Sequence, residues 1–212
     1  MVINALVLGL IKTNCYIVSN DNSEDCVVID PGDRPQQILD YLEGNGLSPK
    51  YIFITHGHFD HVSAVPGIRE KFGSPMVIHA ADTIFLQDIQ RPHYRGKVGV
   101  NERDILIGDG KVIELDGLSF TWLHTPGHSP GSCSILCGDA LFSGDTLFYD
   151  ECGRCDFEGG SYPQMLKSLK RLADLEGNPT VYPGHGPSTT LEREREHNAY
   201  MKEATGVGPP VY

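Results

Sequence analysis

Long apolar runs are missing from this sequence. None of its segments reaches 18 consecutive apolar residues, so we expect no transmembrane helix among its 212 residues. Met1–Ile11 is apolar but has no charged n-region, and Lys12-Thr13-Asn14-Cys15 does not resemble a small-residue cleavage site. We therefore expect the chain to begin with a strand and not with a signal peptide.

Basic residues are scarce as well. The chain has 17 Lys and Arg against 28 Asp and Glu, which gives a formal net charge of -11. No cluster of Lys and Arg is visible, so a nucleic-acid backbone or an anionic membrane surface is not an expected partner. We expect a small-molecule substrate instead, and the sequence does not indicate an oligomeric state.

The cysteines lack a disulfide or zinc pattern. Cys152 and Cys155 form a C-x-x-C, but no second pair has zinc-site spacing and no strand leads into a helix there as in a thioredoxin motif. We interpret this spacing as a coincidence within a loop. The six cysteines are expected to be free thiols of a cytoplasmic protein. They are Cys15, Cys26, Cys133, Cys137, Cys152 and Cys155.

Strand and helix patterns alternate along what we expect to be one domain, residues 1–212. Helices are predicted around Ile38–Leu42, Val62–Phe72 and Ala80–Gln87, from Ser161 with Gln164 as capping partner, and from about Thr189 with Glu192 as capping partner. Residues 88–103 are predicted to be an irregular surface loop, and Trp122 a core residue. Strands are predicted at Val2–Leu8, Cys15–Val18, Cys26–Ile29, Tyr51–Ile54, Met76–Ile78, Asp104–Ile107, Lys111–Leu115, Leu118–His124, Ser132–Cys137, Ala140–Ser143 and Thr180–Tyr182. Two sets of strands, each followed by helices, indicate two packed sheets with helices outside.

A dense polar motif follows the predicted strand at Tyr51–Ile54. Thr55-His56-Gly57-His58-Phe59-Asp60-His61 places three histidines and one aspartate within seven positions. Crowding these polar side chains together costs solvation free energy unless something compensates for it. A divalent metal coordinated by their nitrogen and oxygen atoms is the usual compensation. In an extended segment His56 and His58 point the same way, whereas Asp60 and His61 point toward a different centre.

Three further polar positions come after later predicted strands. They are His128 in Thr125–Ser129, Asp145 in Ser143–Thr146 and His185 in Pro183–Pro187, each flanked by glycine. Glycine lets backbone approach a site closely. Seven potential ligands suit two metals that share one carboxylate.

These motifs resemble the metallo-β-lactamase superfamily, whose pattern is His-x-His-x-Asp-His followed by a His, an Asp and a His. The resemblance extends from Asn14-Cys15-Tyr16 to Pro183–Pro187. It implies an α/β fold of the αβ/βα four-layer type, with two mixed sheets and helices on the outer faces. It also assigns His56, His58 and His128 to a first metal, Asp60, His61 and His185 to a second, and Asp145 to both.

The chemistry implied by the resemblance is hydrolysis. Two divalent ions about 3.5–4 Å apart lower the pKa of a water bound between them to roughly 7. The resulting hydroxide attacks a carbonyl carbon of the substrate. Asp60 and Asp145 are the implied catalytic residues, since they orient the hydroxide and neutralise charge. Zinc is the expected metal, with iron or manganese as alternatives.

Two segments resemble the short bacterial branch that is similar to glyoxalase II. They are Cys152–Gly160 and Pro183–Glu194. This branch implies a thioester substrate such as a hydroxyacyl-thiol. The C-terminal helical region with which glyoxalase II binds glutathione has no counterpart before Tyr212, which puts glutathione in doubt. Arg154 is a candidate for binding a substrate carboxylate through its planar guanidinium; a loop-bracing role is an equal alternative.

Other functions stay open. A mononuclear iron persulfide dioxygenase shares the motif and a Gly-Arg-x-Asp-Phe loop, and would use His56, His128 and Asp145 as a facial triad. A relative that keeps the fold as a scaffold would be expected to have lost ligands, and none is lost here. His58 argues against flavodiiron proteins, which have Glu at this position.

Overall fold

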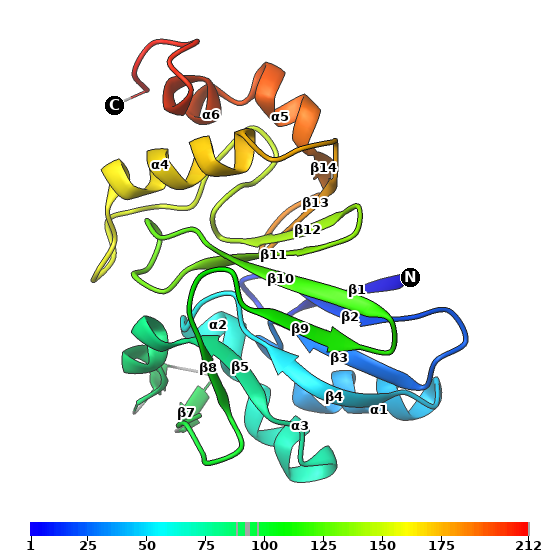
Figure 1. Cartoon of the computed structure of the whole chain (residues 1–212). Helices are drawn as coiled ribbons and strands as arrows, with labels where there is room; N and C mark the ends of the chain where they lie inside the picture. The colour runs from blue at the N-terminus through cyan, green and yellow to red at the C-terminus, as the bar shows by residue number, and fades with distance from the viewer. Residues whose placement is uncertain (88, 92–93, 97, 212) are drawn as a thin grey trace.

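A computed structural model describes residues 1–87, 89–91, 94–96 and 98–211. Its architecture is two six-stranded mixed sheets that pack face to face, with helices on both outer faces (Figure 1). This confirms the predicted αβ/βα sandwich. Among the described residues, no helix is long and apolar enough to cross a membrane.

The first sheet has the order β1-β2-β3-β4-β5-β8, and its last three pairings are parallel. Its outer face is covered by α1 and α3, which lie at the bottom of Figure 1. Its elements are β1 (Val2–Leu8), β2 (Thr13–Ser19), β3 (Asp25–Ile29), α1 (Pro35–Gly44), β4 (Ser48–Phe53), α2 (Phe59–Val62), α3 (Val65–Phe72), β5 (Met76–His79), the 3₁₀ helix η1 (Ala80–Leu86) and β8 (Ile105–Ile107).

The second sheet has the order β14-β13-β12-β11-β10-β9 and is parallel only between β12 and β13. The helices α4, α5 and α6 cover its outer face, at the top of Figure 1. Its elements are β9 (Val112–Leu115), β10 (Leu118–His124), β11 (Cys133–Cys137), β12 (Ala140–Gly144), α4 (Tyr162–Ala173), β13 (Thr180–Pro183), β14 (Thr189–Thr190), α5 (Leu191–His197) and α6 (Ala199–Ala204).

Strand periodicity explains the layering. In β3, Val27 and Ile29 face the second sheet, whereas Cys26 and Val28 face α1 and α3. All four are fully buried, so β3 is apolar on both faces, as expected for a strand covered on both sides. Trp122 lies between the sheets with its ring edge-to-face against Phe53 at 5.5 Å, which confirms its prediction as core.

Three local predictions were wrong. The segment Val62–Phe72 forms two helices, because Pro66 lacks an N–H and fits only in the first turn of a new helix, α3. Ser161 makes no side-chain cap on α4. At α5 the capping side chain is Thr190, which accepts from the Arg193 N–H, because strand β14 extends through Thr190 and the helix begins only at Leu191.

The prediction of an irregular loop over residues 88–103 was also wrong in part. β6 (Ile89–Arg91) and β7 (Tyr94–Gly96) pair there as antiparallel strands. Pro92, which contributed to that prediction, lies outside the described residues. Sequence patterns of three residues are too short to distinguish such a ladder from a loop.

Candidate metal centre

The seven predicted ligands come from loops at one edge of the two sheets. His56 and His58 follow β4, and α2 begins directly after His58, so this single turn of helix turns Asp60 and His61 toward the same edge. His128, Asp145 and His185 follow β10, β12 and β13, which run in the same direction in the second sheet. Their carboxyl ends therefore meet at one edge, as is usual for sites in α/β folds.

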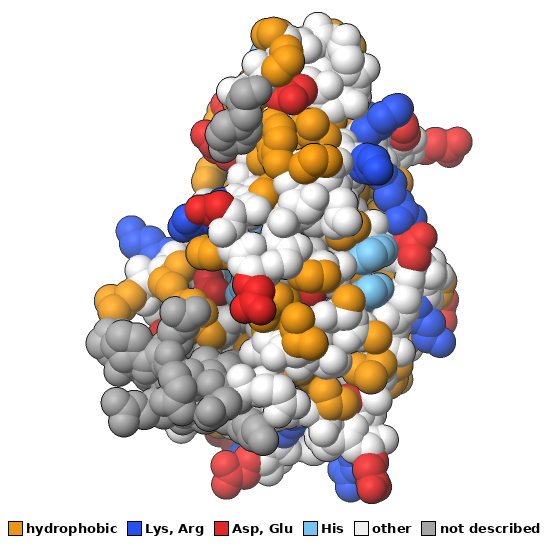
Figure 2. Space-filling view, turned by 90° about the vertical axis from the view of Figure 1, so that its left-hand side faces the viewer, with side chains coloured by type: hydrophobic (Ala, Val, Ile, Leu, Met, Phe, Trp, Pro, Cys, Tyr) orange, Lys and Arg blue, Asp and Glu red, His pale blue; other side chains and the backbone are white. Residues whose placement is uncertain are grey.

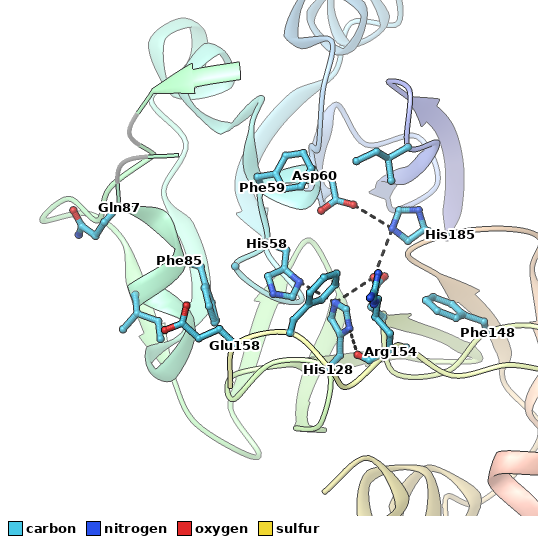
Figure 3. A pocket seen from close by; sticks show the side chains of 16 residues that line it. His58, Phe59, Asp60, Phe85, Gln87, His128, Phe148, Arg154, Glu158 and His185 are labelled. Atoms are coloured by element: carbon cyan, nitrogen blue, oxygen red, sulfur yellow. Dashed lines mark hydrogen bonds and ion pairs between the residues drawn. The ribbon is translucent and has the colours of Figure 1, made fainter. Parts of the chain in front are cut away.

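The side chains assemble into two trios joined by Asp145. Figure 3 labels four of their members, with His58 beside His128 and Asp60 beside His185. One trio is His56, His58 and His128; the other is Asp60, His61 and His185. In each trio the candidate ligand atoms lie within 4.8 Å of one another, and Asp145 forms a third such group with His56 and His61.

Asp145 lies between the trios. Its Oδ2 is 3.5 Å from His128 Nε2 and 3.6 Å from His185 Nε2, and its Oδ1 is 3.5 Å from His61 Nε2. Asp60 Oδ2 is 3.3 Å from His185 Nε2 on the far side. The arrangement brings together all seven residues that the sequence marked.

Unsatisfied polar atoms test whether a metal fits here. His56 Nε2, His61 Nε2 and Asp145 Oδ1 are buried and have no hydrogen-bond partner. A buried polar atom without a partner is costly, and only Arg69 Nε and Trp122 Nε1 share this condition among the described residues. Three such atoms converging in one cluster of imidazoles and carboxylates are the donor set that a divalent cation would satisfy.

The charge states fit the same assignment. Burial, reinforced by neighbouring histidines, lowers the pKa of His58 to about 4 and that of His56 well below its usual range. Burial acts against ionisation of His61, but Asp145, Asp60 and Asp30 outweigh it and raise its pKa to about 10. Burial likewise opposes ionisation of Asp60, yet His61 and His185 hold the pKa of this carboxyl far below normal. Carboxylates and neutral imidazoles are metal-ligating forms, whereas His61 must first lose a proton.

Two buried aspartates that the sequence analysis did not single out hold the ligands in place. Asp30 accepts from Thr55 N at 2.8 Å and Thr55 Oγ1 at 2.6 Å, and its Oδ2 lies 2.9 Å from His61 Nδ1. The position of Asp30 at the end of a predicted strand was a signal that could have identified it.

Asp82, the second of these aspartates, bridges two ligand loops. Its Oδ2 accepts from Gly57 N at 2.8 Å and Ser129 Oγ at 2.6 Å, and its Oδ1 accepts from Gly131 N. Gly57 separates His56 from His58, and Ser129 follows His128. Asp82 lies in η1 without any neighbouring motif, so the sequence offered no signal for it.

Close backbone packing explains two glycines of the site. A Cβ on Gly153 would lie 1.8 Å from the Asp145 carbonyl oxygen, and one on Gly184 would lie 2.2 Å from Asp145 Oδ1. His128 Nδ1 donates to the Arg154 carbonyl at 2.7 Å, so the loop after Gly153 also orients a ligand imidazole.

A cavity of about 1040 Å³ is lined by five of the seven side chains: His58, Asp60, His128, Asp145 and His185. Arg154 lines it, but its guanidinium is paired with Asp156 through two contacts of 2.6 Å and lies over the Phe157 ring at 4.2 Å. The nearby Cys152 and Cys155 are unpaired and pack against the core under α4. Burial raises their pKa values to about 12 and about 11, so they are protonated thiols at neutral pH.

Comparisons with known proteins agree with this geometry. Residues 8–185 match the family model of the metallo-beta-lactamase superfamily. The hydroxyacylglutathione hydrolase GloC of Haemophilus influenzae is 29% identical over 210 residues, which cover 95% of this chain and 98% of that protein.

Two solved structures are similar over nearly their whole length. The B3 metallo-beta-lactamase BLEG-1 has a TM-score of 0.86 and 33% identity, and the match covers 94% of this chain and 99% of that chain. TTHA1623 in a di-iron-bound form has a TM-score of 0.83 and 35% identity, with 93% and 99% covered. A di-iron neighbour leaves the metal of this chain open between zinc, iron and manganese.

Proposed function

This chain belongs to the metallo-beta-lactamase superfamily, and on that premise we propose that it is a two-metal hydrolase of small-molecule thioesters. Family membership supports a metal-dependent hydrolase; the number of metals and the thioester are the further proposed parts. The observation that carries the proposal is the convergence of three unsatisfied buried ligand atoms around Asp145.

We assign His56, His58 and His128 to one cation, Asp60, His61 and His185 to the other, and Asp145 to both. Two divalent cations held there would supply a hydroxide nucleophile at neutral pH and polarise the substrate carbonyl. Asp60 is ionised and lines the cavity, so it can accept a hydrogen bond from a water and orient it. Asp145 lies beside ligands of both trios, so its carboxylate would offset positive charge of both cations. Asp30 keeps the His61 ring in position.

The name of GloC supports a thioester, since a hydroxyacylglutathione is one. The B3 metallo-beta-lactamase BLEG-1 makes a β-lactam the natural comparison substrate. The six unpaired thiols support a reducing, cytoplasmic location.

The direct test is an assay of metal-loaded protein with S-lactoylglutathione, other thioesters and a β-lactam. We expect thioester hydrolysis, and we expect His58→Ala to lower kcat/KM by at least about 100-fold. His197→Ala is the matched control, because His197 is an exposed histidine of α5 outside the cluster. Equal activity of wild type and His58→Ala would reject the proposal.

The alternative is a mononuclear iron persulfide dioxygenase with His56, His128 and Asp145 as ligands. With a single metal at those three residues, His61 Nε2 would stay buried without a hydrogen-bond partner, which favours the two-metal assignment. One iron per chain with oxygen uptake on a persulfide would favour the dioxygenase. Two metals without oxygen uptake would favour the hydrolase.

A further inference from the structure

The cavity beside the metal centre is walled by apolar side chains on both sides of the ligand cluster. Phe85 and Phe157 lie edge-on to His58, with ring centroids 5.2 and 5.5 Å away, and Phe148 lies 6.2 Å from His185 at the opposite end. Figure 3 shows Phe85 and Phe148 on opposite sides of the histidines. Ile11, Phe59 and Ile84 complete the apolar lining.

Several of these side chains are exposed around one opening. Ile84 is 60% exposed, Ile11 50% and Phe157 44%. They come from distant parts of the chain: Ile11 from the turn after β1, Ile84 from η1 and Phe157 from the loop after β12. Single exposed apolar residues are ordinary, but a group of them around a cavity is typical of a ligand-binding site.

Among the residues that the structure describes, the charges at the opening do not suit an anionic substrate. Among the described lining residues, Arg154 is the only Lys or Arg, and the Nε–Nη2 edge of its guanidinium donates two hydrogen bonds to Asp156. Glu158 adds a further negative charge to the rim. On the face shown in Figure 2, most Lys and Arg side chains lie near the outline, while hydrophobic and some acidic side chains are scattered over the rest of the face.

We propose that the natural substrate is an uncharged thioester with an apolar thiol part, held against Phe157, Phe85 and Ile84, and not a glutathione thioester. This inference rests on the proposed thioester hydrolysis and specifies its substrate class. Glutathione carries two carboxylates, which would meet Glu158 and an arginine already paired. An apolar thiol needs no such partner and buries the exposed rings of the wall.

Two thioesters with the same acyl group test the inference, one of benzyl mercaptan and one of glutathione. Both are alkyl thiols, so the comparison concerns the pocket more than the reactivity of the leaving group. We expect kcat/KM to be at least about tenfold higher for the benzyl thioester. We expect Phe157→Ala to lower that value about tenfold through KM and so to reduce the ratio of kcat/KM between the benzyl and the glutathione thioester.

Binding gives a readout that does not need turnover. In uncleavable ketone analogues a CH₂ replaces the thioester sulfur, and their Kd values can be measured by calorimetry on metal-loaded protein. We expect the benzyl analogue to bind at least about tenfold more tightly than the glutathione analogue. We also expect Asp156→Asn to free Arg154 and to tighten only the glutathione analogue, severalfold. Asp174→Asn is the matched control, since Asp174 pairs with Lys170 on α4.

The outcomes separate the two claims. Equal or tighter binding of the glutathione analogue by the wild type would overturn the substrate class and leave thioester hydrolysis standing. Tighter binding of the benzyl analogue, lost in Phe157→Ala, without turnover of either thioester, would support the apolar pocket and reject the proposed reaction.

Discussion

His61 and Asp30 form a buried pair, with His61 Nδ1 2.9 Å from Asp30 Oδ2 and neither side chain accessible beyond 3%. The contact fixes the ring so that Nε2 faces Asp60 and Asp145, at 3.7 and 3.5 Å. A carboxylate behind a ligand histidine orients the ring and raises its basicity. Asp30 therefore acts on the metal centre without being one of its ligands.

Asp30→Asn is expected to weaken metal binding about 10–100-fold at the centre made by Asp60, His61 and His185. The amide is neutral, so it no longer balances a charged or metal-bound His61. Competition with a chelator measures the affinity, and elemental analysis after dialysis measures the number of metals retained. Asp174→Asn, far from the cluster, should keep wild-type stoichiometry; retention of both metals by Asp30→Asn would contradict this role.

Asp82→Asn is expected to act on the other trio. One amide N–H must then face either the Gly131 N–H or the Gly57 N–H, so one buried donor loses its acceptor. We expect a loss of about 1–3 kcal/mol in the free energy of unfolding. Because Gly57 and Ser129 adjoin His56, His58 and His128, we also expect weaker binding of one metal. Denaturant titration with and without metal checks both effects, and a variant as stable as wild type would refute the bridging role.

Gly153→Ala is expected to disrupt the site, because its Cβ would overlap the Asp145 carbonyl and also approach His128 Cβ. The backbone must shift, which should cost about 1–3 kcal/mol or more and remove most activity. Gly108→Ala is the matched control, since a Cβ there meets nothing within 4 Å. Thermal unfolding and thioester assays on the two variants should differ clearly; similar behaviour would count against the packing described here.

Metal affinity is expected to rise with pH. The pKa of His61 is about 10, so this imidazole is protonated at neutral pH in the metal-free protein and must release its proton to bind a cation. The pKa of His58, about 4, means that it releases none above pH 6. Burial opposes ionisation of His185, but its hydrogen bond with Asp60 and the charge of Asp145 raise its pKa, which makes the dependence on pH steeper. The logarithm of the affinity should therefore increase by about one to two per pH unit between pH 6 and 8.

Chelator competition at several pH values measures this slope, and an affinity independent of pH would contradict the protonation of His61.

The sequence predicted the sandwich and the seven clustered residues because both depend on local patterns. Strands such as Leu118–His124 are bounded by turns, and His56 to His61 stand directly after one such strand. Asp82 could not be predicted, because its importance comes from Gly57 and Ser129, which are distant in sequence. The pairing of Arg154 with Asp156 was equally invisible, since side-chain contacts within a loop follow from its folded shape.

Capping errors have a related cause. Thr189 and Thr190 are both plausible caps from sequence; both pair with β13, so the helix begins only at Leu191 and Thr190 takes the cap position. Tertiary contacts thus determine helix boundaries that local propensity leaves undetermined.

Elemental analysis of the purified protein, beside its Asp145→Ala variant, tests the central claim most directly. The two trios joined by Asp145 predict two metal equivalents per wild-type chain and a clear loss of metal in the variant. A wild-type protein that takes up a single metal when both zinc and iron are offered in excess, or none, would contradict the account.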